Sequence, residues 1–74
     1  MRPVSLPKSV TLPKAAMIDA PHLQTVLGAS RAVICLWRHH SGFPVSHREG
    51  RCAWTFCDDV AQWCENHGSK VVRL

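Results

Sequence analysis

The sequence has 74 residues, a length that fits one domain with a thin core and argues against a deep active-site cleft. Nine lysines and arginines against five aspartates and glutamates give a formal net charge of +4, which favours a polyanionic partner such as nucleic acid. No apolar run approaches the roughly 20 residues that cross a bilayer, and the N-terminus lacks the apolar core of a signal peptide. We therefore expect a cytoplasmic, nucleoid-associated protein with no membrane partner.

Prolines interrupt the N-terminal segment. Pro3, Pro7 and Pro13 alternate with basic residues, a pattern that disfavours helix and leans to extended conformations. We predict that residues 1–16 form a flexible basic arm, which is either a plain unstructured terminus or a segment that reaches DNA phosphates. Residues 17–68 form the folded domain, and residues 69–74 form a short C-terminal tail.

The first helix is predicted to follow a short strand or turn at residues 15–19. Asp19 is a suitable N-cap, and Pro21 falls in the first turn, where proline is tolerated. The helix then runs to about Leu27. Its buried face is marked by apolar residues at positions i, i+3 and i+4, namely Leu23, Val26 and Leu27.

A second helix is predicted from about Ser30 to Ser41, after a break at Gly28 and Ala29. Glycine tolerates the turn, and the Ser30 hydroxyl can accept a hydrogen bond from the free amides of the first turn. Gly42 ends the helix and Pro44 prevents its continuation. The apolar side carries Val33, Ile34 and Trp37, and the opposite, largely cationic side carries Arg31, Cys35, Arg38 and His39.

A β-hairpin is predicted next, with strands at residues 45–47 and 51–56. The loop Arg48-Glu49-Gly50 supplies a glycine for the positive φ that a tight turn requires. Arg48 and Arg51 flank the tip, as in a wing that lays cations along a phosphate backbone. The alternative is an ordinary solvated turn.

The third helix is predicted to begin between Thr55 and Cys57, with Thr55 and Asp58 as a capping box, and to end at Gly68. Its apolar stripe is Val60, Trp63, Cys64 and His67. Over the whole domain, the predicted core is Leu23, Leu27, Ile34, Trp37, Phe43, Trp54, Val60 and Trp63.

The cysteines Cys35, Cys52, Cys57 and Cys64 are predicted to be reduced thiols, because no secretory context supports disulfides. No C-x-x-C pair occurs, and the spacing to His67 does not match common zinc sites. Cys35 lies among cations, which suits a nucleophile, but an exposed helix face offers no pocket or oxyanion donors. We expect no metal, no cofactor and no enzymatic activity.

The order helix, turn, helix, hairpin, helix resembles the small winged helix-turn-helix proteins of the excisionase and AlpA type, which have a MerR-like fold. The sequence is also similar to the DNA-binding domains of phage terminase small subunits. The resemblance implies a mostly α fold with a small β-hairpin, in which three short helices and a wing make residues 17–68 a DNA-binding domain. It rests on Leu27-Gly28-Ala29-Ser30 before Val33-Ile34, Gly42-Phe43-Pro44-Val45, Gly50-Arg51, Trp54, and Asp59-Val60 with Trp63.

The function implied by this resemblance is sequence-specific binding of double-stranded DNA in a phage or integrative element. The protein would act as an excisionase, which is a recombination directionality factor, or as a small transcriptional regulator. Its further partners would be an integrase or recombinase, RNA polymerase, or other copies of itself bound cooperatively to DNA. The alternatives are the DNA-recognition subunit of a packaging terminase and a protein-interaction module that binds an acidic partner.

Candidate contacts with DNA follow from side-chain chemistry. Arginine can read guanine with a pair of hydrogen bonds, and cations at a hairpin tip suit phosphates. We assign base contacts to Ser30, Arg31, Cys35 and Arg38, and phosphate contacts to His39, Arg48 and Arg51.

Overall fold

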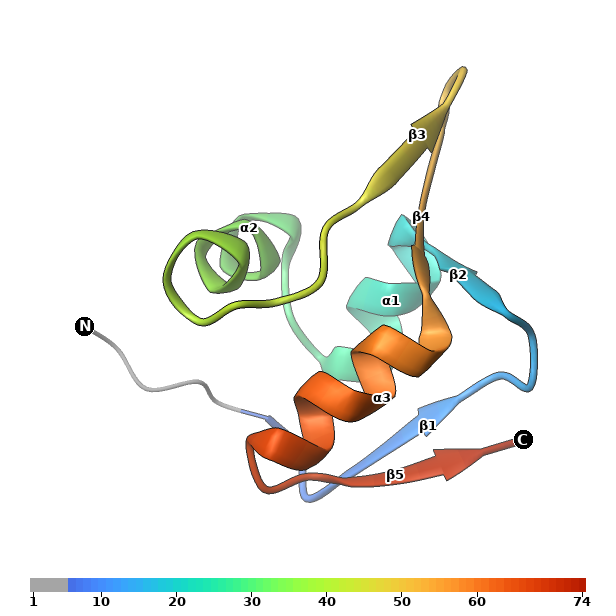
Figure 1. The fold of residues 1–74 in the computed structure, drawn as a ribbon. Helices are drawn as coiled ribbons and strands as arrows, with labels where there is room; N and C mark the ends of the chain where they lie inside the picture. Colours follow the sequence, from blue (N-terminus) through green and yellow to red (C-terminus); the bar gives the residue numbers. More distant parts are fainter. Residues whose placement is uncertain (1–5) are drawn as a thin grey trace.

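The computed structural model describes residues 6–74 as a mixed α/β fold with three helices and five strands in two sheets (Figure 1). The predicted fold class, a mostly α winged helix-turn-helix, is therefore wrong. Strands outside the hairpin account for the difference. In chain order the elements are β1 (Ser9–Leu12), β2 (Met17–Asp19), α1 (Ala20–Leu27), α2 (Arg31–His40), β3 (His47–Glu49), β4 (Cys52–Phe56), α3 (Cys57–Asn66) and β5 (Lys70–Arg73).

The first sheet joins the two ends of the described chain. β1 and β5 pair in parallel, from Ser9 opposite Lys70 to Leu12 opposite Arg73. Val10 and Leu12 are completely buried, so residues 9–12 are a core strand and not part of a flexible arm. The C-terminal tail likewise contains a strand. Residues 1–5 of the predicted arm lie outside the described residues.

The second sheet has three antiparallel strands in the order β2-β4-β3. Its β3–β4 hairpin corresponds to the predicted one, and Gly50 has the positive φ of 61° that the turn requires. The added strand β2 pairs with β4, so that Ile18 lies opposite Thr55. The hairpin is thus anchored at its base and projects at its tip (Figure 1).

The first two helices form where the sequence predicts them. An Asp19 side-chain oxygen accepts a hydrogen bond from the His22 amide at 2.9 Å, and Gly28 ends α1 in the left-handed conformation. The Ser30 hydroxyl accepts from the Val33 amide at 3.3 Å and caps α2. Local capping chemistry therefore sets the corner between α1 and α2.

The predicted capping box of the third helix is wrong. Thr55 is buried within β4, and α3 begins only at Cys57, after Phe56, with no side-chain cap. The Cys57 amide instead donates to the Ala16 carbonyl at 2.9 Å, which satisfies a free donor of the first turn. None of the described helices is long and apolar enough to cross a membrane.

The core lies between the helices and the buried faces of both sheets. Trp54, a predicted core residue, is only half-buried, and its ring stacks on His47 on the outer face of the three-stranded sheet, with centroids 4.6 Å apart. His67, placed in the α3 stripe, is exposed. The buried hydrophobic residues are Val10, Leu12, Ile18, Leu23, Leu27, Ile34, Trp37, Phe43, Cys57, Val60, Trp63 and Cys64.

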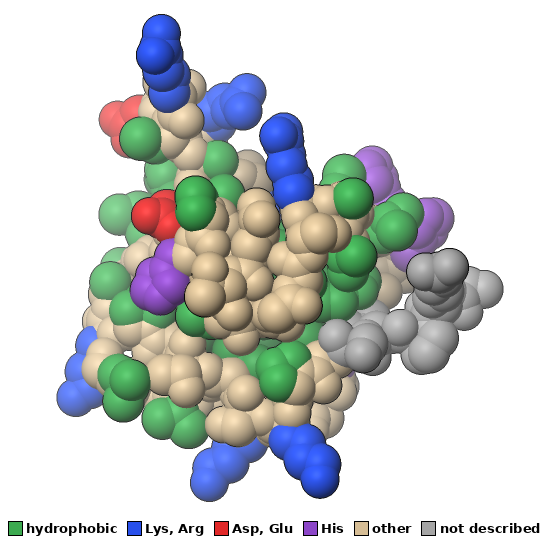
Figure 2. Space-filling model, turned by 180° about the vertical axis from the view of Figure 1, so that it is seen from behind, with side chains coloured by type: hydrophobic (Ala, Val, Ile, Leu, Met, Phe, Trp, Pro, Cys, Tyr) green, Lys and Arg blue, Asp and Glu red, His purple; other side chains and the backbone are tan. Residues whose placement is uncertain are grey.

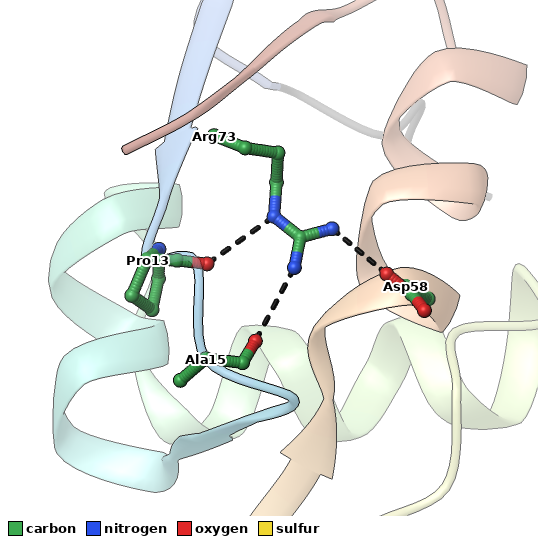
Figure 3. Close-up of polar contacts among 4 residues, drawn as sticks. All are labelled: Pro13, Ala15, Asp58 and Arg73. Carbon is green, nitrogen blue, oxygen red and sulfur yellow. Dashed lines mark hydrogen bonds and ion pairs between the residues drawn. The ribbon is translucent and has the colours of Figure 1, made fainter.

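Arg73, at the end of β5, connects the two sheets (Figure 3). Its Nε donates to the Pro13 carbonyl at 3.2 Å, and Nη2 donates to the Ala15 carbonyl at 3.2 Å. Nη1 makes an ion pair with Asp58 of α3 at 2.8 Å. One guanidinium thus fixes the connection between β1 and β2 against the first turn of α3.

We expect Arg73→Ala to lower the free energy of unfolding by about 2 kcal/mol, because the carbonyl bonds carry most of the contribution. Asp58→Asn is the matched control, and it should cost less than about 1 kcal/mol, because the carboxylate is 89% exposed. Urea unfolding of both variants measures the difference. Equal losses would show instead that the ion pair dominates.

Candidate nucleic-acid interface

A groove of about 800 Å³ lies between α2, the start of α1 and the β3–β4 hairpin. The corner at Gly28 places α2 beside α1, and the loop after α2 leads back into the hairpin. Lys and Arg side chains surround the raised hairpin in Figure 2. The groove is lined by Asp19, Ala20, Pro21, Leu23, Gln24, Arg31, Ile34, Cys35, Arg38, Ser46, Arg48, Arg51, Cys52, Ala53 and Thr55.

Four arginines make this groove strongly cationic: Arg31 and Arg38 come from α2, and Arg48 and Arg51 come from the hairpin. Asp19 is the one acidic side chain in the lining, and its Oδ1 already accepts the capping bond of α1. The single ion pair within residues 6–74 is the one between Arg73 and Asp58. The arginines of the groove are therefore free to bind an anion.

Arg38 differs from the other three arginines because it is held in place. Its Nε donates to the Pro44 carbonyl at 3.0 Å, and its guanidinium carbon lies 5.4 Å from the centre of the Phe43 ring. Burial lowers the pKa of Arg38 from its ordinary value, and the neighbouring Cys35 acts in the opposite direction. The Nε bond leaves the two terminal nitrogens of a fixed guanidinium for a ligand.

Five of the seven predicted contact residues line the groove: Arg31, Cys35, Arg38, Arg48 and Arg51. Ser30 and His39 do not. The Ser30 oxygen accepts the capping bond of α2, and His39 lies exposed near the end of that helix, with its ring 6.4 Å from that of His40. The structure thus brings together the predicted cations of α2 and the hairpin.

The contribution of α1 to the groove is not predicted by the sequence. Gln24 is half-buried in the lining, and an amide of this kind can pair with the edge of adenine. Ser46 adds a hydroxyl from the loop before β3. No local pattern marks these residues, because their position depends on how α1 packs against the hairpin.

The cysteines divide into an exposed pair and a buried pair. Cys35 and Cys52 are exposed and line the groove, whereas Cys57 and Cys64 are core residues. Burial raises the pKa of Cys57, and burial with a smaller effect of Glu65 raises that of Cys64 to about 11. The buried thiols therefore stay protonated near neutral pH. The described part of the chain holds no cluster of metal-ligating side chains.

Comparison with known proteins finds no family model, no curated protein and no solved structure that matches this chain. The resemblance to excisionase and AlpA-type proteins therefore stays a prediction.

Proposed function

We propose that this protein binds double-stranded DNA through α2 and the β3–β4 hairpin. The observation that supports this proposal is the groove in which four arginines face a common space without acidic partners. Phosphate and guanine are both recognised by arginine, because the planar guanidinium offers paired donors to either group. An open groove lined by four arginines suits a long polyanion better than a small neutral substrate.

Each wall of the groove has its own role in this proposal. Arg31 and Cys35 lie on the exposed side of α2 and contact base edges, and the fixed fork of Arg38 reads guanine beside them. Arg48 and Arg51, at the hairpin tip, bind the adjacent sugar-phosphate backbone, which sets the register but carries no sequence information.

The biological role proposed for this binding follows the family resemblance: an excisionase or a small transcriptional regulator of a mobile element. An excisionase needs an integrase or recombinase as its partner, and a regulator acts on RNA polymerase. Selection of bound sequences from a random duplex pool would provide the target site. Sites that fall in recombination attachment regions would favour the first role, and sites that fall in promoters would favour the second.

Two substitutions test the division between base and phosphate contacts. Arg31→Ala should relax the sequence preference, while Arg48→Ala should weaken binding to all duplexes alike and lower the salt slope by about one unit. Gel-shift titrations at several salt concentrations measure both effects. Lys14→Ala, at an exposed cation away from the groove, is the control. Unchanged affinity and selectivity in both arginine variants would contradict the proposal.

A further inference from the structure

The two-stranded sheet of β1 and β5 ends in an unpaired edge. β5 pairs with β1 alone, and no third strand joins this sheet within residues 6–74. In Figure 1 β5 is the outermost element at the end of the molecule opposite to the hairpin tip. An open edge of this kind offers a row of backbone donors and acceptors to another extended chain.

The register identifies which backbone groups face outward. The amides of Lys70 and Leu74 donate to the carbonyls of Lys8 and Leu12, each at 2.9 Å, so these residues face β1. Because backbone groups alternate in direction along a strand, the N–H and C=O groups of Val71 and Arg73 face away from β1. These two residues form the free edge of β5.

The surroundings of this edge are basic. Lys8, Lys14 and Lys70 are exposed, and residues 6–18 and 68–74 contain no aspartate or glutamate. Lys and Arg side chains also gather at this end of the molecule in Figure 2. Within the described chain, Arg73 alone of these cations has an acidic partner, Asp58. The charge therefore complements an acidic segment.

We propose that the β5 edge binds an acidic, extended segment of a partner protein, which adds to the sheet as a third strand. Its backbone pairs with Val71 and Arg73, and an acidic side chain lies beside Lys70 on the exposed face. The unpaired backbone groups favour a peptide over nucleic acid, because a peptide alone can continue the ladder of hydrogen bonds. Cross-strand pairs of opposite charge add to this pairing.

The edge is preformed, which lowers the ordering cost of binding. The Arg73 side chain is fixed by the carbonyls of Pro13 and Ala15, and Val71 packs against the core. The site also lies at the opposite end of the molecule from the hairpin (Figure 1). The protein can therefore hold DNA and a protein partner at the same time.

The test uses the full chain and a short peptide of alternating glutamate and valine, with a lysine-valine peptide of equal length as control. The acidic peptide should bind saturably and slow hydrogen exchange at the Val71 and Arg73 amides, as followed by NMR. Val71→Pro removes an outward N–H without removing a bond to β1, so it should weaken binding about five- to tenfold. Thr11→Pro, at an outward-facing position of β1, should leave the affinity unchanged.

Lys70→Glu keeps every backbone group and therefore tests the effect of charge alone. It also tests the proposal if the proline variant fails to fold. This variant should lose the acidic peptide and gain affinity for the lysine-valine peptide. Peptide binding without protection of the Val71 and Arg73 amides would overturn the proposal. Protection of the same amides by duplex DNA would also overturn it. The DNA affinity of the same variants is measured as well. A change in peptide binding at unchanged DNA affinity distinguishes the failure of this proposal from the failure of the proposed function.

Discussion

Replacing Arg38 with alanine should cause the largest loss of DNA affinity that any single substitution in the groove produces. The other three groove arginines are exposed, whereas Arg38 is half-buried and held by the Pro44 carbonyl and the Phe43 ring. A side chain that is already ordered loses little conformational entropy when it binds. We expect Arg38→Ala to cost about 2–3 kcal/mol in binding and to remove any preference for guanine at one position.

Arg38→Lys is the informative companion, because lysine keeps the charge but not the fork. A lysine ammonium cannot occupy the Nε position and also present two fixed donors, so the lysine variant should recover less than half of the lost binding energy. Gel shifts against the selected duplex and its guanine-substituted derivatives measure both quantities. Circular dichroism checks that α2 remains folded. Full recovery by lysine would indicate a simple phosphate contact at Arg38.

The parts of the fold that the sequence predicts are those fixed by local chemistry. Asp19 and Ser30 cap their helices through hydrogen bonds three residues along the chain, and Gly28 supplies the left-handed turn between them. Gly50 does the same for the hairpin. Each of these signals acts within a few residues, so one short window of sequence contains all the information.

The two-stranded sheet of β1 and β5 depends on long-range pairing that no short window of sequence contains. Residues 9–12 alternate polar and apolar side chains, a strand pattern that the flanking prolines obscure. Their partners lie at residues 70–73, at the other end of the described chain. Thr55 does not cap α3, because its long-range pairing with Ile18 places it inside β4. Tertiary pairing therefore overrode local propensity.

The candidate site likewise combines residues that a local pattern predicts with residues whose position depends on tertiary packing. The helical period predicted that Arg31, Cys35, Arg38 and His39 share one side of α2, and all of these except His39 line the groove. The contribution of Gln24 depends on the packing of α1 beside the hairpin. The anchoring of Arg38 by Pro44 depends on the path of the loop after α2. Charge could be read from the sequence, but the shape of the groove could not.

Trp63 connects the core to this groove. Its ring lies 5.3 Å from Trp37 of α2 and 4.7 Å from Phe43, measured between ring centroids. Its Nε1 donates to the Ser41 carbonyl at 2.9 Å. Phe43 in turn lies under the Arg38 guanidinium. A single α3 side chain thus supports both the end of α2 and the loop that leads into the hairpin.

Trp63→Ala should lower the free energy of unfolding by about 3–5 kcal/mol, because it opens a large cavity in a thin core and leaves the Ser41 carbonyl without its donor. Urea unfolding followed by circular dichroism measures this loss. Trp54→Ala is the matched control and should cost less than about 2 kcal/mol, because that ring is half-exposed on the outer face of the sheet. Equal destabilisation by the two alanine variants would contradict this expectation, because the outer aromatic stack would then stabilise the fold as much as Trp63 does.

Trp63→Phe keeps most of the packing but loses the hydrogen bond to Ser41. Its effect on DNA binding therefore separates the aromatic support of Arg38 from the positioning of the loop.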